Sequence, residues 1–346
     1  MIRAAIVNDL PMAVTALRRV LDAAPGIEVA WTAHDGAEAV EMCARDVPDV
    51  ILMDLIMPVM DGVEATRRIM RESPCAVVVV TATVSGNAGK VFEAMGHGAL
   101  DAVATPVLGL DGAVSGGEEL LKKIFTIAKL LAKPGDAKGQ ALPVRAVAPS
   151  FRQPALAVIG ASTGGPKAVA TILADIPRDV DAALVVVQHV DMRFADGLAE
   201  WLASQCTLRV QVAADGQRLI PGVVHVAGTN DHLVLRPDLT LCYQAEPVDY
   251  PYRPSVDAFF SSVARHWPSP GVAALLTGMG RDGAKGLLAL RQAGWSTIAQ
   301  DQATSVVYGM PKAAADLDAA RHILPLPDIA RAILDNLVPR STTHAG

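Results

Sequence analysis

Three side chains in the second half of the chain could together activate a nucleophile. Ser162 lies within VIGASTGGP (158–166), and GASTG fits the GxSxG pattern of a sharp turn that exposes a serine hydroxyl. A serine needs a neighbouring base, and that base needs an orienting acid. His189 follows the apolar run ALVVVQ, and Asp282 follows VAALLTGMGR. These residue types predict acyl-transfer chemistry with Ser162 as nucleophile, His189 as base and Asp282 as orienting acid.

The same glycine-rich turn could instead cradle a phosphate. A dinucleotide-binding fingerprint is GxGxxG after a strand, with an acid about 20 residues further on. Here the register gives Gly160, Ser162 and Gly165, so the middle glycine is a serine. The next apolar strand ends in His189 rather than in an acid, which disfavours a nicotinamide cofactor. Taken singly, His189 could be an ordinary strand-end residue and Asp282 could cap the helix that follows it, so the hypothesis depends on the three residues together.

A second group of polar residues stands at strand ends in the first half of the chain. Apolar runs end at Asn8 and Asp9, at Asp54 and at Thr81. The carboxyl ends of parallel strands meet at one edge of a sheet. Two carboxylates there would repel each other unless a cation lies between them, and oxygen ligands suit Mg²⁺. Because a carboxylate can attack a phosphoryl group, this edge predicts a Mg²⁺-dependent phosphoryl acceptor.

Both groups need parallel sheets to position them, and the alternation of apolar runs with helical periodicity predicts two α/β domains. Residues 1–132 alternate five strands with five helices, which predicts a (βα)5 doubly wound domain. Residues 133–153 are rich in Pro and Gly and predict a linker. Residues 154–340 predict a Rossmann-like α/β domain with a parallel sheet and a small antiparallel β insertion, and 341–346 predict a flexible tail. The triad requires three strands to be parallel neighbours: 156–160, 183–188 and 272–277.

Composition narrows the function classes. A chain of 346 residues suggests two domains, and 51% hydrophobic residues are ample for their cores. The net charge is −6 without a run of Lys and Arg, which argues against nucleic-acid binding. The four cysteines are widely spaced, so neither a zinc site nor a disulfide framework is expected. MIRAAIVND is typical of a strand rather than a signal peptide, and the apolar run 76–80 is too short to span a bilayer. We expect a cytoplasmic protein without direct membrane insertion.

The motifs NDLP, MDLIMPVMDG and VVTAT, at their spacing in the first domain, resemble a response-regulator receiver domain. The resemblance implies that Asp54 is the phosphoacceptor. It implies that Asp9, Asp54 and the carbonyl of Ile56 hold Mg²⁺, and that the Thr81 hydroxyl senses the phosphoryl group.

Two residues depart from the receiver pattern. Asn8 stands where a second acid is usual, and Thr105 stands where a lysine is expected before the proline of DAVATP. A lysine there would pair with the phosphoacceptor and with the phosphoryl group, and Thr105 cannot supply that charge. Asn8 removes one negative charge and offsets part of the loss. We therefore expect Asp54 to be phosphorylated, with an altered switch.

The second domain resembles the CheB family of chemoreceptor glutamate methylesterases. The resemblance is carried by GASTGGP, VVVQHV, LTGMGRDGA, RPSVDAFF and VVYGMPKAA. It implies that Ser162 attacks a glutamate γ-methyl ester, that His189 takes the serine proton and later activates water, and that Asp282 orients the imidazole. The backbone amide of Met279 would help to hold the oxyanion, and Thr163 would support the site. The products would be glutamate and methanol, and many relatives also deamidate receptor glutamines.

The receiver motifs and KVFEAMGHGALD are most similar to the surface-sensing Wsp branch of the family, which adjusts a diguanylate cyclase. The implied partners are a methyl-accepting chemoreceptor-like substrate and a CheA-type histidine kinase as phosphate donor. An unphosphorylated receiver would cover the esterase site, and phosphorylation would expose it. The alternative is a non-catalytic docking or phosphate-sink protein of a chemosensory pathway.

Other candidates are weaker. His225 and His232 lie seven residues apart without a third ligand nearby, so structural roles are favoured over a metal site. Arg253 could pair with receptor carboxylates, whereas Ser255 could cap the helix that follows.

Overall fold

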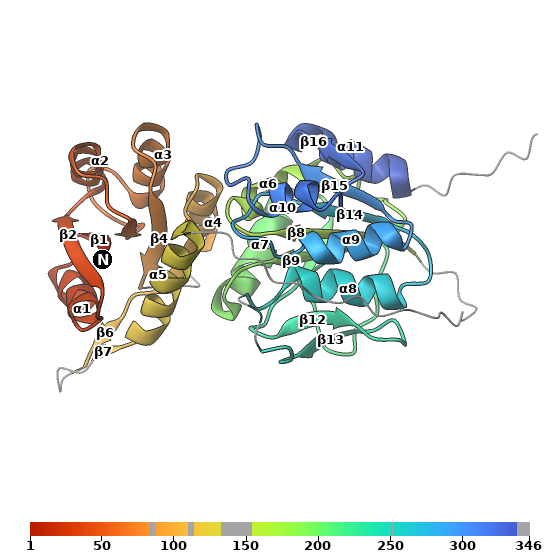
Figure 1. Ribbon diagram of the computed structural model, residues 1–346, viewed down its shortest axis with the longest axis horizontal. Helices are drawn as coiled ribbons and strands as arrows, with labels where there is room; N and C mark the ends of the chain where they lie inside the picture. Colours follow the sequence, from red (N-terminus) through yellow and green to blue (C-terminus); the bar gives the residue numbers. More distant parts are fainter. Residues whose placement is uncertain (83–87, 110–113, 133–153, 249, 251, 338–346) are drawn as a thin grey trace, which may run out of the picture. The chain divides into compact units, whose positions relative to one another are not determined.

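The computed structural model describes residues 1–82, 88–109, 114–132, 154–248, 250 and 252–337. The chain divides into two compact units, Met1–Lys138 and Gly139–Gly346 (Figure 1). The linker predicted for 133–153 and the tail predicted for 341–346 lie outside the described residues.

The first unit is built on a five-stranded sheet in the order β2-β1-β3-β4-β5, and every neighbouring pair is parallel. Its strands are β1 (Ile2–Val7), β2 (Ile27–Ala33), β3 (Val50–Met53), β4 (Ala76–Thr81) and β5 (Asp101–Ala104). Its helices are α1 (Pro11–Asp22), α2 (Gly36–Arg45), α3 (Gly62–Glu72), α4 (Ala88–Gly96) and α5 (Gly117–Ala132). The doubly wound fold predicted from the alternation is confirmed.

Burial explains why the strands of this unit read as nearly continuous apolar runs. Every residue of β3 and β4 is buried, as expected of strands covered on both faces. Leu17 on α1 and Ile124 on α5 share one core with Leu52. Capping side chains fix where two of the helices begin. The carboxylate of Asp35 accepts hydrogen bonds from the first turn of α2, and Asp61 caps α3 in the same way. A short antiparallel pair, β6 (Val107–Leu108) with β7 (Val114–Ser115), was not predicted, because two-residue strands carry no periodicity.

The second unit contains a seven-stranded sheet in the order β10-β11-β9-β8-β14-β15-β16, with all pairs parallel. These strands are β8 (Ala155–Ala161), β9 (Ala182–Gln188), β10 (Arg209–Val212), β11 (Val223–Val226), β14 (Val272–Leu275), β15 (Ser296–Gln300) and β16 (His322–Leu324). The helices are α6 (Gly165–Ala174), a 3₁₀ turn η1 (Met192–Phe194), α7 (Ala195–Gln205), α8 (Val256–His266), α9 (Ala284–Gln292), α10 (Met310–Asp316) and α11 (Leu326–Leu337). The strand β8 lies between β9 and β14, as the predicted site requires.

The predicted small antiparallel insertion is confirmed. There β12 (His232–Leu235) and β13 (Leu241–Gln244) pair antiparallel, and Arg218 and Thr240 form an isolated antiparallel bridge. The other two strands of the region, β10 and β11, extend the main sheet in parallel instead. Short apolar runs separated by turns do not distinguish these two arrangements, because each strand carries the same pattern in both.

The core of the second unit joins the sheet to α8 and α9. Phe259 and Phe260 of α8 are fully buried beside Val158 and Leu275 of the sheet. The helix α8 begins at Val256 because the Ser255 hydroxyl accepts a hydrogen bond from the amide of Ala258, which confirms the predicted cap. None of the helices in the described ranges combines the length and the apolar composition that a membrane span needs.

Candidate active site

Three adjacent strands deliver the predicted serine, histidine and aspartate. Ala161 of β8 pairs with Gln188 of β9, so Ser162 and His189 follow directly paired positions. Neighbouring strands lie about 4.8 Å apart, which brings the two residues close together. On the other side of β8, the strand β14 leads into the loop that carries Asp282.

The structure joins His189 to Asp282. The distance between His189 Nε2 and Asp282 Oδ2 is 2.7 Å, and each side chain is only 7% exposed. Burial raises the pKa of Asp282, but the hydrogen bond with His189 and further donors outweigh it and lower the pKa below its usual value. An ionised carboxylate only accepts hydrogen bonds, so Nε2 carries the proton and Nδ1 is left as the acceptor nitrogen.

Asp282 receives its other hydrogen bonds from the start of α8. The amide of Val256 donates to Oδ2 at 2.7 Å, and the amide of Asp257 and the hydroxyl of Ser255 donate to Oδ1 at 3.0 and 2.8 Å. The residue ahead of α9 is Gly283, so Asp282 does not cap the helix that follows it. Its carboxylate instead complements the amide end of a helix that begins 26 residues earlier, where the helix dipole favours negative charge.

Ser162 is 7% exposed, and its main chain is held on both sides. Its amide donates to the carbonyl of Thr277 at 3.0 Å, and its carbonyl accepts from the amide of Gly165 at 2.8 Å. A Cβ at Gly278 would lie 2.7 Å from the Ser162 Cβ, so only glycine lets the loop after β14 approach the serine this closely. Within the described residues His189 Nδ1 has no hydrogen-bond partner, so the serine hydroxyl is not bonded to it in this structure. Catalytic hydrogen bonds often tighten only when substrate is bound.

The two supporting residues predicted from the sequence also lie at this rim. The amide of Met279, beside Gly278, donates to no acceptor among the described residues, which leaves it available to an oxyanion. Thr163 is 2% exposed, and its carbonyl accepts a hydrogen bond from the Thr277 hydroxyl at 2.8 Å.

Sequence reasoning missed several residues that contact the site. The rings of Tyr252 and His189 stack, with centroids 4.3 Å apart and planes 8° from parallel. Gln188 donates from its amide to the carbonyls of Ser162 and His189. Asp257 neighbours Asp282, and burial, followed by the Asp282 charge, raises the pKa of Asp257 to about 7. Gln188 adjoins the predicted base in VVVQHV, and this adjacency is the signal that could have identified it.

The first unit gathers its predicted site residues at the ends of β1, β3 and β4. Asn8 Nδ2 donates to Asp54 Oδ2 at 3.1 Å, and the amide of Leu55 donates to Asp54 Oδ1 at 2.7 Å. Burial raises the pKa of Asp54, and the negative charge of Asp9 adds to this effect. Thr81 is 1% exposed.

The main chain of Thr105, which stands where the receiver pattern has a lysine, bonds to the end of β4. The amide of Thr105 donates to the Thr81 carbonyl at 2.9 Å. Ile56, whose carbonyl is the third predicted metal ligand, is 53% exposed. In the part of the chain that the structure describes, no group of three His, Cys, Asp or Glu side chains is arranged to hold a metal ion.

The weaker candidates make contacts within the second unit. His225 and His232 are fully buried, and burial lowers the pKa of His225 to about 4. Arg253 lies 4.0 Å from Asp231 and donates to the Val248 carbonyl at 3.4 Å.

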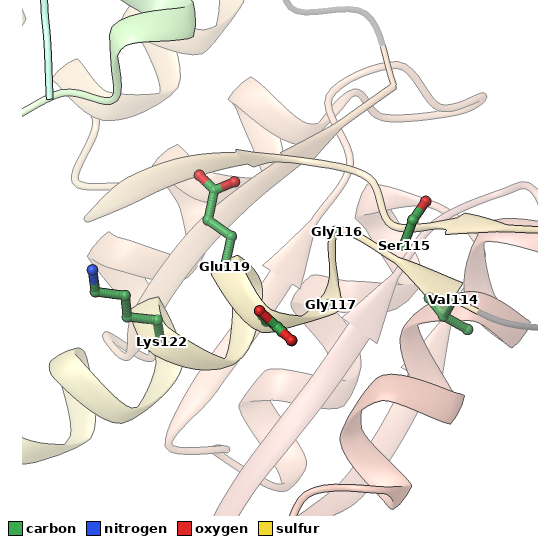
Figure 2. A pocket seen from close by; sticks show the side chains of 7 residues that line it. Val114, Ser115, Gly116, Gly117, Glu119 and Lys122 are labelled. Atoms are coloured by element: carbon green, nitrogen blue, oxygen red, sulfur yellow. The ribbon is translucent and has the colours of Figure 1, made fainter.

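A pocket of about 560 Å³ lies at the start of α5 in the first unit (Figure 2). Its lining includes Ser115, Glu119 and Lys122, and it contains none of the residues predicted for either site.

Comparisons with known proteins identify the family of each unit. Residues 157–333 match the CheB methylesterase family, and residues 4–109 match the response regulator receiver domain. A Cupriavidus metallidurans protein named protein-glutamate methylesterase/protein-glutamine glutaminase 2 is 57% identical over 95% of this chain and 96% of its own. A Pseudomonas aeruginosa protein of the same name, numbered 3, is 54% identical over 95% of this chain and 97% of its own. The crystal structure of the Thermotoga maritima CheB methylesterase catalytic domain is 34% identical, with a TM-score of 0.51, and covers 53% of this chain and 98% of that one. The chain therefore belongs to the CheB methylesterase family, with a response regulator receiver domain ahead of the methylesterase domain.

Proposed function

We propose that this chain hydrolyses glutamate γ-methyl esters on a chemoreceptor-like protein, with Ser162, His189 and Asp282 as a catalytic triad. The observation that carries the proposal is the 2.7 Å contact between His189 and a buried, ionised Asp282, on the strand ends that flank Ser162. The names of the two relatives support the same activity.

The first half of the reaction transfers the acyl group to Ser162. Its Oγ attacks the ester carbonyl carbon while His189 Nδ1 takes the hydroxyl proton. The negative charge that forms on the carbonyl oxygen is held by the free amide of Met279, close to Gly278, where a backbone without a Cβ allows near approach. The C–O bond to the methoxy group then breaks, His189 gives its proton to the departing oxygen, and methanol leaves.

The second half releases the acyl group. His189 Nδ1 takes a proton from water, and the oxygen attacks the acyl carbon. The bond to Ser162 Oγ breaks, and the serine regains its proton from His189. The product is a glutamate side chain. Asp282 stays ionised throughout and stabilises the imidazolium that forms in each half.

The same site would deamidate receptor glutamines. The attack on an amide carbonyl is identical, and ammonia leaves in place of methanol. Both relatives carry protein-glutamine glutaminase in their names, which supports this second activity.

We propose that Asp54 accepts a phosphoryl group from a CheA-type histidine kinase with the help of Mg²⁺. Burial raises the pKa of Asp54, and the negative charge of Asp9 adds to this effect, so a bound cation would favour the ionised form of Asp54. Two carboxylates and the Ile56 carbonyl are oxygen ligands of the kind that Mg²⁺ prefers, so the residues fit the ion. Mg²⁺ would neutralise charge on the phosphoryl oxygens, while Thr81 and Asn8 border the acceptor.

We further propose that the chain serves the surface-sensing Wsp branch and acts in the cytoplasm. The receiver motifs and KVFEAMGHGALD support this branch. The test compares methylated receptors of a surface-sensing pathway with those of a flagellar pathway as substrates. Faster methanol release from the former is expected, and equal or slower release would contradict the branch assignment.

The esterase proposal is tested by replacing the orienting acid. Asp282→Asn keeps the shape of the side chain but removes the charge that stabilises the imidazolium, and the corresponding change in a serine protease costs about 10⁴-fold in kcat. We expect a loss of this order in methanol release from receptor membranes carrying [³H]methyl esters. Asp316→Asn, at an exposed position of α10, is the matched control. An Asp282→Asn variant with wild-type kcat would contradict the triad.

A further inference from the structure

Gln188, the last residue of β9, lies between the proposed nucleophile and the proposed base. Its side chain is fully buried. One nitrogen, Nε2, donates to the carbonyl of Ser162 at 2.8 Å and to the carbonyl of His189 at 3.2 Å. A single amide therefore bridges the main chains of the two residues, just beyond the last rung where β8 and β9 pair.

The contacts of Gln188 fix which way its amide faces. Both neighbours of the nitrogen are carbonyl oxygens, so only an NH₂ group satisfies them. The other end, Oε1, is buried and accepts no hydrogen bond from the described residues. A buried acceptor without a partner costs free energy, so the fold tolerates this cost at a position where the donor end is used.

The glycine-rich turn makes room for this amide. A Cβ at Gly165 would lie 2.1 Å from Gln188 Oε1, closer than any real contact. The second glycine of STGGP is thus explained by a side chain of the neighbouring strand. Gly165 also donates from its amide to the Ser162 carbonyl, so the turn and the glutamine act on the same atom.

We propose that Gln188 is a positioning residue that fixes Ser162 and His189 relative to each other. It reaches the main chain of both and leaves their side chains free to react. This inference rests on the proposed esterase function. A shift of about 1 Å between reacting groups can cost about 100-fold in rate.

Gln188→Met is the first test, because methionine has a similar length and an unbranched, adaptable side chain but no amide donors. With full-length protein and [³H]methyl-labelled receptor membranes, we expect kcat to fall about 100-fold and KM to stay within about twofold. Thr297→Val is the matched control: Thr297 is fully buried in β15 of the same sheet, its hydroxyl accepts from the amide of Arg321, and its loss should leave kcat unchanged. An unchanged kcat in a folded Gln188→Met variant would overturn the proposal.

Gln188→Glu gives a readout that a purely structural role would not produce. A buried carboxyl has a raised pKa, and its neutral form can still donate one hydrogen bond. Its ionised form would face two carbonyl oxygens and repel them. The ratio of variant to wild-type kcat should therefore rise as the pH falls from 8 to 5.5, and a flat ratio would contradict the proposal.

The esterase function and the positioning role of Gln188 are tested separately. If wild-type protein and Ser162→Ala protein release methanol equally, the esterase function is wrong. If wild type is active, Ser162→Ala is inactive and both Gln188 variants match wild type at every pH, only the positioning role is wrong.

Discussion

Two contacts of different kinds constrain the imidazole of His189. The hydrogen bond to Asp282 fixes the position of Nε2, and the stacked ring of Tyr252 fixes the plane. The remaining nitrogen, Nδ1, then faces one direction only. In the proposed reaction, a base held in this way would need little reorganisation when it takes the serine proton, which is the advantage of a preorganised site.

The stacking contact can be tested separately from the Tyr252 hydroxyl. Tyr252→Phe keeps the ring and should retain nearly full activity, whereas Tyr252→Leu removes the stack. Stacked aromatic pairs are worth about 0.5–1.5 kcal/mol, so we expect kcat of the leucine variant to fall by roughly 2- to 12-fold. Equal kcat values for the two variants, measured by methanol release, would show that the ring plane does not matter.

At the scale of elements, the start of α8 acts as the holder of the orienting acid. Its first amides and the capping Ser255 hydroxyl donate to Asp282, while Asp257 accepts from the amide of Gly286 in α9 at 2.7 Å. Two carboxyl groups therefore meet at one helix end. Burial and the neighbouring charge of Asp282 raise the pKa of Asp257, because protonation of Asp257 removes the repulsion between the two carboxylates.

This raised pKa makes stability depend on pH. The pKa of Asp257 is about 7 in the folded chain against a reference of 3.8, so the folded state holds the proton longer. The contribution of this raised pKa to the free energy of unfolding is fully present below about pH 4 and is lost as the pH rises to about 7. Asp257→Asn removes the dependence and keeps an acceptor for Gly286. The melting temperature of the variant minus that of wild type should therefore increase from pH 5 to pH 8.

Tryptophan fluorescence can follow the melting of the second unit, which contains Asp257. Three of the four tryptophans lie in that unit: Trp201, Trp267 and Trp295. A shift of 1 kcal/mol corresponds to about 2–4 °C for a domain of this size. A difference in melting temperature that is constant or decreases with pH would contradict the assignment. Asp316→Asn, on the exposed side of α10, is the control.

The sequence predicted the strands better than it predicted their side-chain partners. The apolar runs located β8, β9 and β14, because a strand buried on both faces is a nearly continuous apolar run. The runs do not determine strand order; the predicted triad requires these three strands to be neighbours, and the sheet order meets that condition. The role of Asp282 at α8 could not be predicted, because its donors lie 26 residues earlier in the chain. The Gln188 bridge depends on the orientation of one buried side chain, which the hydrophobic pattern of a sequence does not predict.

At the scale of the whole molecule, the chain joins a receiver to an esterase. Phosphorylation changes activity only by the difference in its effect on two states of the protein. Asn8 bonds directly to Asp54, and Thr105 brings no charge to that edge, so the receiver departs from the usual lysine-based arrangement. We infer that phosphorylation of Asp54 is coupled only weakly to esterase activity.

A small-molecule phosphate donor tests this switch in the intact chain. With acetyl phosphate and Mg²⁺, we expect methanol release to rise about fivefold, which is the low end of typical allosteric couplings. Asp54→Asn should show no response, and chelation of Mg²⁺ should abolish the response of wild type. A wild-type rate that ignores the donor, together with no labelling of Asp54, would mean that the receiver is only a docking surface.

The most direct test of the central claim is the release of [³H]methanol from methylated receptor membranes by wild-type and Ser162→Ala protein. Loss of the serine from a subtilisin triad costs about a million-fold in kcat. We predict that wild-type protein releases methanol and that the variant, folded and equally concentrated, falls to the uncatalysed background. Equal release by the two proteins, or release by neither, would contradict the account and favour a non-catalytic docking protein.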